Sequence, residues 1–318
     1  MEYVRLGDSG LYVSKVILGT ASYGSSKWQE WVMEEEEALP LLEHAFKSGI
    51  NTWDTADAYS NGLSEEIIGK ALRKFNIPRS EVVIMTKIYY ALDPIDQSPI
   101  SALSTKDKAG LVNRVGLSRK HILDAVAASC ARLGTYIDVL QIHRLDRDTP
   151  VREIMRALHD VVESGQVRYL GASSMAAWEF QQLQNTAKVN GWHCFISMQN
   201  YYNLLYREEE REMIPYCPHP WDSRHSKREQ SDKLLQSLVR KDQNIEVDKE
   251  VVTRVARIAE QRSVSMAVVA LAWCFFKDVQ PITGLGSKER IDEAVASVGF
   301  KLDDEEIAYL EEPYRPKE

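Results

Sequence analysis

The sequence predicts an α/β protein whose parallel strands form a (β/α)8 barrel, the TIM-barrel architecture. Short apolar segments rich in β-branched residues alternate along the chain with amphipathic helical patterns. Such alternation indicates a parallel sheet, and the number of units favours a closed barrel over an open sheet. The 318 residues, 44% of them hydrophobic, can bury one large core, so we expect a single barrel domain over residues 1–318.

The strands are predicted from short apolar runs bounded by turn residues. The polar turn Gly7–Gly10 is expected to join two short strands near the N-terminus. The core strands are then Val13–Leu18, Asn51–Thr55, Val82–Thr86, Asp138–Ile142, Tyr169–Ala172, Phe195–Met198 and Val279–Thr283.

Helices are predicted between these strands from apolar residues at helical spacing. Their ranges are Glu36–Lys47, Ser64–Lys74, Ser118–Arg132, Pro150–Glu163, Ala176–Ala187, Glu208–Tyr216, Lys249–Glu260 and Ser265–Phe276. In the second, Ser64 is expected to cap the helix, with Glu65 and Glu66 in its first turn. Its buried face would consist of Ile68, Ala71, Leu72 and Phe75.

Only seven core strands are found, one fewer than a complete barrel requires. Two long polar segments, Ile88–Leu117 and Pro218–Val247, interrupt the regular pattern. Connections of such length are usually functional or disordered.

The charge balance excludes several classes of partner. A net charge of -8 opposes binding to a nucleic-acid backbone or an anionic membrane, because either surface requires a basic face. The four cysteines are widely spaced, with no CxxC pair, and fit a reducing compartment. Without a signal segment at Met1 or an apolar run longer than Met266–Phe276, we expect a soluble protein of the cytoplasm.

Ionisable groups end the second, third and fourth strands. Asp54, with Tyr59 just beyond it, is followed by Lys87 and His143. The carboxyl ends of barrel strands gather on one face, so these four side chains can converge. A lysine beside a tyrosine stabilises tyrosinate and makes the phenol a better proton donor near neutral pH. Asp54 would hold Lys87, and His143 would orient a carbonyl oxygen, but a hydride source must come from a cofactor.

Seven motifs in order then carry a family resemblance. They read DTADAY followed by SEEIIGKAL, then MTK, QIHRLD, GASS, SMQN and PITGLGSKERIDEA. Over nearly its whole length the chain resembles the aldo-keto reductases, especially fungal members that act on secondary metabolites and aryl aldehydes. The resemblance implies a TIM barrel that binds NADP(H) without a Rossmann domain, in agreement with the absence of an early G-x-G-x-x-G motif. It also implies reversible reduction of an aldehyde or ketone to an alcohol, with a small carbonyl or alcohol as substrate.

The resemblance assigns roles to individual residues. Tyr59 would be the proton donor, Lys87 and Asp54 would tune it, and His143 would position the substrate oxygen. The cofactor residues would be Thr20 and Asp54 near nicotinamide, Ser173, Ser174 and Gln199 on its carboxamide, and Gly284, Ser287, Arg290 and Glu293 around the adenosine 2'-phosphate. The glycine-rich turn that opens onto a helix at Gly284 suits an anionic phosphate.

Two departures from the family pattern concern cofactor binding. The usual Ser-Asn pair after the fifth strand is Ser173-Ser174 here, a mild change because a hydroxyl can still bond to an amide. After Cys217, the chain lacks the segment that forms the seventh strand and the pyrophosphate loop in relatives. We therefore expect that strand and its loop to be deleted or replaced, through exon skipping, a mis-drawn gene model or degradation of the enzyme.

Other interpretations remain for several residues. Asp54, Lys87 and His143 could each be structural if taken alone. Trp28 and Trp31 could be packing aromatics or could line an aromatic substrate pocket. No metal is expected, because the candidate ligands lack the close spacing of a zinc site; they are His193, Cys194, Cys217, His219 and His225. The run Arg207–Glu212 resembles a solvated helix face.

Three functions stay open at this stage. The first is an NADP-dependent carbonyl reductase, which the complete set of four residues favours. The second is an NADPH-binding regulatory subunit, and the third is a catalytically impaired pseudoenzyme. Substrate identity and oligomeric state cannot be read from the sequence.

Overall fold

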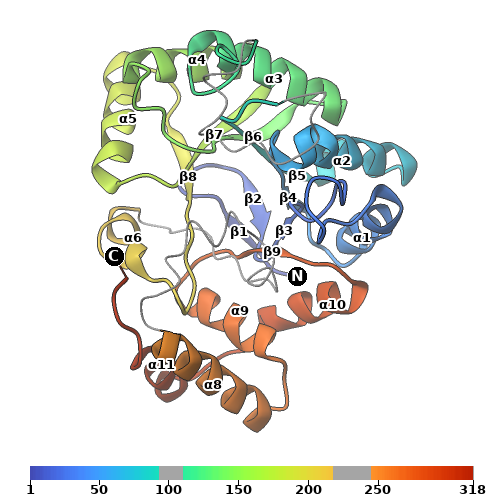
Figure 1. Ribbon diagram of the computed structural model, residues 1–318, viewed down its shortest axis with the longest axis vertical. Coiled ribbons are helices and arrows are strands. Elements are labelled where there is room, and N and C mark those ends of the chain that lie inside the picture. Colours follow the sequence, from blue (N-terminus) through green and yellow to red (C-terminus); the bar gives the residue numbers. More distant parts are fainter. Residues whose placement is uncertain (93–109, 218–244, 318) are drawn as a thin grey trace.

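A parallel sheet of seven strands, curled and surrounded by helices, forms the body of the molecule (Figure 1). The computed structural model describes residues 1–92, 110–217 and 245–317. The strands are β3 (Ile17–Gly19), β4 (Thr52–Asp54), β5 (Val83–Ile88), β6 (Ile137–Ile142), β7 (Val167–Ser173), β8 (Phe195–Gln199) and β9 (Ile282–Gly284). They pair in the order β8-β7-β6-β5-β4-β3-β9, each pair parallel. The predicted α/β barrel class is confirmed.

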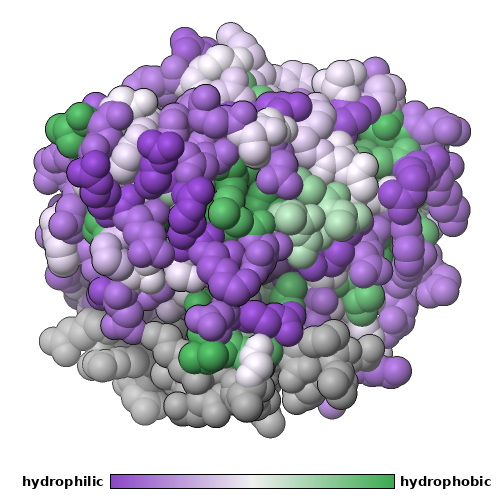
Figure 2. Space-filling model, turned by 90° about the horizontal axis from the view of Figure 1, so that it is seen from above, coloured by the Kyte–Doolittle hydropathy of each residue, from purple (hydrophilic) through white to green (hydrophobic). Residues whose placement is uncertain are grey.

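Helices follow most strands and pack on the outside of the sheet. They are α1 (Glu35–Lys47), α2 (Leu63–Lys74), α3 (Arg119–Leu133), α4 (Val151–Glu163), α5 (Ala177–Asn190), α6 (Met213–Tyr216), α8 (Ile245–Gln261), α9 (Met266–Phe276), α10 (Lys288–Ala296) and α11 (Asp304–Glu311). From the side of α3 and α4, the surface is mostly hydrophilic with a small apolar patch near its middle (Figure 2). This agrees with helices that bury only one face.

A short hairpin closes one end of the barrel. β1 (Tyr3–Arg5) pairs antiparallel with β2 (Tyr12–Ser14), as the turn Gly7–Gly10 predicted. Leu6 and Val13 pack against inward-facing strand residues, among them Val139. Gly7 has a φ of +54°, and a Cβ there would lie 2.3 Å from the carbonyl oxygen of Ile196 on β8. Only glycine permits this approach.

The predicted strand Val13–Leu18 is divided in the structure. Its first residues belong to β2 and its last to β3, so the chain bends between the hairpin and the barrel. The Ser14 hydroxyl donates to the carbonyl of Val16 at 2.6 Å within this bend. An apolar run does not reveal that its two ends join different sheets.

The predicted helix Glu208–Tyr216 is also divided, into the 3-10 turn η3 (Glu208–Glu210) and α6. A continuous helix would place Pro215 in its interior, where the ring clashes with the carbonyl four residues earlier. In the observed structure Pro215 lies in the first turn of α6, where a missing N–H is tolerated.

Ser64 was predicted to cap α2, and this was wrong. The N-cap is Gly62, with a φ of 96°, and Ser64 lies buried inside the first turn. Its hydroxyl donates to the carbonyl of Thr20 and accepts from the Thr55 hydroxyl, both at 3.0 Å. Ser64 therefore ties the helix to the ends of β3 and β4. The predicted buried residues Ile68, Ala71 and Leu72 are buried.

The ring of strands has two free edges in the part of the chain that the structure describes. β8 and β9 end the pairing order, and no described strand lies between them. This agrees with the seven strands counted from the sequence. The predicted loop deletion after Cys217 falls next to residues 218–244, which lie outside the described ranges.

Candidate active site

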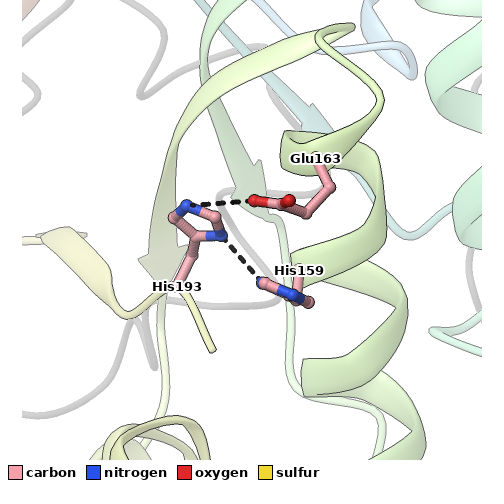
Figure 3. A group of neighbouring side chains, drawn as sticks. All are labelled: His159, Glu163 and His193. Carbon is pink, nitrogen blue, oxygen red and sulfur yellow. Dashed lines mark hydrogen bonds and ion pairs between the residues drawn. The ribbon is translucent and has the colours of Figure 1, made fainter. Parts of the chain in front are cut away.

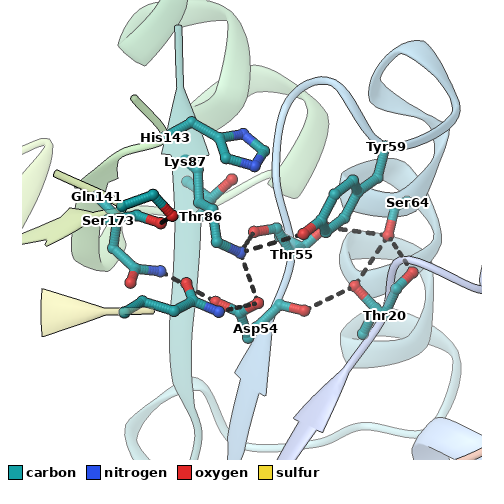
Figure 4. Close-up of polar contacts among 12 residues, drawn as sticks. Thr20, Asp54, Thr55, Tyr59, Ser64, Thr86, Lys87, Gln141, His143 and Ser173 are labelled. Atoms are coloured by element: carbon teal, nitrogen blue, oxygen red, sulfur yellow. Dashed lines mark hydrogen bonds and ion pairs between the residues drawn. The ribbon is translucent and has the colours of Figure 1, made fainter. Parts of the chain in front are cut away.

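The carboxyl ends of β4, β5 and β6 bring a carboxylate, an ammonium and a phenol into contact (Figure 4). Lys87 Nζ donates to Asp54 Oδ2 at 2.5 Å, to the carbonyl of Thr55 at 2.8 Å and to Tyr59 Oη at 3.4 Å. All three side chains are at least nine-tenths buried, Lys87 completely so. Because an ammonium only donates hydrogen bonds, the Tyr59 oxygen accepts here and keeps its own O–H for another partner.

His143 completes the group from the end of β6. Its ring stands edge-on to the ring of Tyr59, with centroids 6.0 Å apart, and it is 8% exposed. The His143 N–H donates to the carbonyl of Ile88, which fixes the backbone beside β5. The four residues predicted to converge therefore do so.

Two glutamines hold the carboxylate of this group in place. Gln141 Nε2 on β6 donates to Asp54 Oδ1 at 3.0 Å, and Gln199 Nε2 on β8 donates to Asp54 Oδ2 at 3.4 Å. Sequence analysis assigned no role to Gln141. Its position two residues before His143, on a strand whose side chains alternate, was the signal that it points into the barrel.

The residues predicted for the nicotinamide end lie around the same carboxylate. The Thr20 hydroxyl donates to the backbone carbonyl of Asp54 at 3.0 Å and contacts the Ser64 hydroxyl at 2.9 Å. Ser173 and Ser174 place their hydroxyl oxygens 3.2 Å apart at the end of β7, in register with Gln199. Gln199 Oε1 is buried and has no hydrogen-bond partner among the described residues. A buried acceptor beside two hydroxyls fits the carboxamide of a nicotinamide.

The residues predicted for the adenosine end lie two strands away. Strand register places Gly284 beside Gly19, and Gly19 beside Asp54, so Gly284 is about 10 Å from Asp54. Ser287 caps α10 and accepts from the Arg290 N–H at 3.3 Å, and the Arg290 side chain is exposed. Glu293 follows on the next turn of α10 and is half-buried. An arginine at a helix N-terminus is suited to a phosphate group.

Aromatic rings flank the tyrosine on both sides. The Trp28 ring, on the connection after β3, lies 6.4 Å from that of Tyr59 and 6.1 Å from that of Trp31. Tyr90, just beyond β5, stands edge-on to His143 at 5.1 Å. Sequence analysis singled out Trp28 and Trp31 but not Tyr90, although its place two residues after the strand was available as a signal.

Two further acids, Asp57 and Glu65, are buried near the site. Glu65 on α2 accepts from the Thr86 hydroxyl at 2.5 Å and from Arg132 Nε at 2.6 Å. Glu65 lies in the first turn of α2, as predicted, and its side chain is buried in the interior. Burial, reinforced by the nearby Glu65 carboxylate, raises the pKa of Asp57 well above its usual value.

The run Arg207–Glu212 is not the solvated helix face that was predicted. Arg207 donates to Glu210 at 2.7 Å and to Glu311 on α11 at 3.0 Å. Glu209 accepts from Asn200 Nδ2 at 2.9 Å, and burial, together with the charge of Glu208, raises its pKa to about 7. Asn200 Oδ1 in turn accepts from the backbone N–H of Ser174 at 3.2 Å.

Comparisons with known proteins identify the family of this chain. Residues 15–315 match the model of the aldo/keto reductase family. The chain belongs to the aldo/keto reductase family. It is thus an oxidoreductase of a family that acts on small-molecule carbonyls and generally uses a nicotinamide cofactor.

Fungal proteins are among its similar relatives. A versiconal hemiacetal acetate reductase of Aspergillus parasiticus is 61% identical over 338 aligned positions, which cover 100% of this chain and 98% of the relative. A putative aryl-alcohol dehydrogenase of Saccharomyces cerevisiae is 47% identical, with coverage of 100% and 98%. An aldo-keto reductase of Alternaria alternata is 48% identical, with coverage of 98% and 92%.

The alignments also bear on the missing strand. The first relative aligns over 338 positions, whereas this chain has 318 residues. About 20 positions of that alignment therefore have no residue from this chain, enough for one strand and a loop.

No helix among the described residues is long and apolar enough to cross a membrane.

Proposed function

We propose that this protein catalyses the NADPH-dependent reduction of an aldehyde or ketone to an alcohol, with Tyr59 as the proton donor. The observation that carries the proposal is the buried contact of Lys87 with both Asp54 and Tyr59. Bound NADPH would supply the hydride, which no side chain of the protein can provide. The reaction is reversible, so alcohol oxidation would use the same groups.

The residues around Tyr59 favour proton donation to a carbonyl oxygen. Lys87 stabilises negative charge on the phenolic oxygen as its proton leaves. Asp54 and its two glutamine donors fix the ammonium, so little reorganisation is needed during the reaction. His143, edge-on to Tyr59, is placed to orient the substrate oxygen.

Two groups of residues would bind the two ends of NADP(H). Gln199, Ser173 and Ser174 would hold the carboxamide, with Thr20 and Asp54 beneath the nicotinamide. Gly284, Ser287, Arg290 and Glu293 would surround the 2'-phosphate, which is why we favour NADPH over NADH. An arginine that reads this phosphate has no equivalent partner in NADH.

An aromatic carbonyl is the substrate class that the site favours. Trp28 lies beside Tyr59 and Tyr90 lies beside His143, and both rings could contact a planar substrate ring. The names of the relatives, which include a hemiacetal acetate reductase and an aryl-alcohol dehydrogenase, support this class. We place the reaction in fungal secondary metabolism and in the cytoplasm.

Replacement of Tyr59 by Phe tests the assignment directly. Tyr59→Phe keeps the ring and removes the proton, so kcat with an aryl aldehyde should fall by about 10²–10⁴-fold. NADPH affinity, measured by cofactor fluorescence, should change little. Turnover is followed as loss of NADPH absorbance, and NADH serves as the comparison cofactor.

Two competing functions are proteins without turnover: an impaired enzyme, which a deleted strand would favour, and a cofactor-binding regulatory subunit. Such a protein would show no NADPH oxidation in the wild type with any aryl aldehyde, and Tyr59→Phe would then have no effect. Failure of the wild type to bind NADPH at about micromolar concentration would support the impaired form. Binding without turnover would support a regulatory subunit.

A further inference from the structure

Three potential metal ligands meet at the other end of the barrel (Figure 3). His159 and Glu163 lie one turn apart on α4, and His193 lies in the connection between α5 and β8. His159 Nδ1 is 2.8 Å from His193 Nδ1, and His193 Nε2 is 3.8 Å from Glu163 Oε1. One potential ligand atom from each residue lies within 4.8 Å of the others.

This cluster is remote from the carbonyl chemistry. Glu163 ends α4 just before the chain enters β7 at Val167, and His193 comes two residues before β8 begins. Both segments therefore lie at the amino ends of the strands, whereas Tyr59, Lys87 and His143 lie at their carboxyl ends. A ligand held by the cluster would act on the fold and not on the substrate.

The two imidazoles meet edge to edge. Their nitrogens are 2.8 Å apart while their ring centroids are 4.9 Å apart, with only 29° between the planes. Such a contact requires a proton on one Nδ1 and a lone pair on the other. A divalent ion can take the place of that proton, so that both nitrogens donate their lone pairs to the ion.

We infer that His159, Glu163 and His193 form a zinc site with water as the fourth ligand. Bonds of about 2.0–2.1 Å in a tetrahedron separate the ligand atoms by about 3.3–3.4 Å, and one ligand atom from each of the three residues already lies within 4.8 Å of the others. The side chains of His193 and Glu163 are 42% and 63% exposed, so they can make the small rotations required. Two imidazoles and one carboxylate favour zinc over calcium or magnesium.

Trp192 and two arginines lie beside the cluster. The His159 ring lies nearly parallel to that of Trp192, at 6.3 Å, and this contact restricts its rotation. The guanidinium of Arg156 lies 5.7 Å from the centroid of the Trp192 ring. Its charge is paired with Asp160 at 2.9 Å. Arg152 lies at the same distance from that ring.

A bound ion would link α4 to the segment that leads into β8. β8 is one of the two free edges of the described sheet, so a link here stabilises the part of the barrel with fewest neighbours. Sequence spacing did not reveal the site, because the two histidines are 34 residues apart. The prediction of no metal considered His193 without His159.

Calorimetric titration with Zn²⁺ alone, at neutral pH and without NADPH, tests the inference. We expect one ion per chain with a Kd of about 1–10 μM, and a higher melting temperature in its presence. His159→Asn and His193→Asn should each weaken binding by about tenfold or more, and Glu163→Gln by less.

Two control variants separate this site from other histidines. His44→Asn removes a histidine that pairs with Asp292 and should leave zinc binding unchanged. The double variant His219→Asn/His225→Asn removes the histidines outside the described residues and should also bind one ion. Circular dichroism verifies that each variant is folded.

Three outcomes would overturn the inference. They are the absence of zinc binding at about 100 μM, unchanged stoichiometry and affinity in folded His193→Asn, and loss of the ion in the His219/His225 variant. Because the readout is heat and melting temperature, these results do not depend on whether the chain reduces carbonyls.

Discussion

Lys87 and Asp54 form an ion pair that is almost completely removed from solvent. Lys87 is 0% exposed and Asp54 is 1% exposed. Removing one member of such a pair leaves the other charge buried, and this costs more than removing both. The pair is therefore useful for separating the stability of the site from its chemistry.

We expect Lys87→Met to lower the free energy of unfolding by about 3–5 kcal/mol and to abolish turnover. The double variant Lys87→Met/Asp54→Asn should recover part of this loss, because no buried charge remains, but it should stay inactive. Urea denaturation at neutral pH measures both variants. If the double variant is less stable than Lys87→Met by the full loss in unfolding free energy that Asp54→Asn causes alone, the two residues are not coupled.

Ser174 occupies a backbone conformation that serine tolerates poorly. Its φ is +53°, in the left-handed region, where asparagine is the favoured residue other than glycine. This explains why the family pattern has Ser-Asn at a position where this chain has Ser173-Ser174. The replacement of asparagine by Ser174 therefore changes the backbone strain as well as the side chain.

Ser174→Asn should therefore raise the free energy of unfolding by about 0.5–1 kcal/mol. Ser263, with a φ of +52° beyond the end of α8, is a matched control far from the site. Ser263→Asn should give a similar gain in thermal denaturation without changing NADPH affinity. A loss of stability in Ser174→Asn alone would show that the Ser173–Ser174 hydroxyl contact matters more than the backbone.

At the scale of elements, the turn η3 contacts the site through Glu209. Glu209 accepts a hydrogen bond from Asn200, just after β8, and Asn200 accepts one from the backbone N–H of Ser174. Burial raises the pKa of Glu209 to about 7, so the folded protein binds a proton that the unfolded chain releases near pH 4.5. Stability from this group is present below about pH 4.5 and is lost as the pH rises to about 7.

Glu209→Gln should remove this pH dependence. Relative to the variant, the wild type should lose about 1–3 kcal/mol of unfolding free energy between about pH 4.5 and 7, a range reduced to allow for partial exposure of the side chain. Denaturant titrations at a series of pH values measure the difference. If the unfolding free energy changes with pH in the same way in both proteins, the ionisation of Glu209 does not affect stability.

At the scale of the whole molecule, the free edges of β8 and β9 in the described part of the sheet are the main departure from a closed barrel. Unpaired strand edges expose backbone N–H and C=O groups and weaken a sheet. The relative from Aspergillus parasiticus aligns over about 20 positions that this chain lacks. We therefore expect the deletion to lower the stability of the barrel by an amount that can be measured.

Insertion of the corresponding segment of that relative after Cys217 should raise the melting temperature and tighten NADPH binding by about tenfold or more. A Gly-Ser insert of the same length is the control, since it adds chain without a strand. Thermal denaturation and cofactor fluorescence provide the two readouts. Equal effects of both inserts, or none, would contradict a missing strand at this place.

The sequence by itself determined the order and type of most elements and the convergence of Asp54, Tyr59, Lys87 and His143. Hydrophobic periodicity is local, and parallel strands place their carboxyl ends together whatever lies between them. Even the count of seven strands followed from this local signal.

Only the tertiary structure decided which polar residues are buried and what they contact. Ser64, Glu65 and Glu209 looked like ordinary first-turn or surface residues, because burial depends on segments distant in the chain. The same holds for the positive φ of Ser174 and for the meeting of His159 with His193. These features arise where separate elements pack together, and no local pattern of residues encodes that contact.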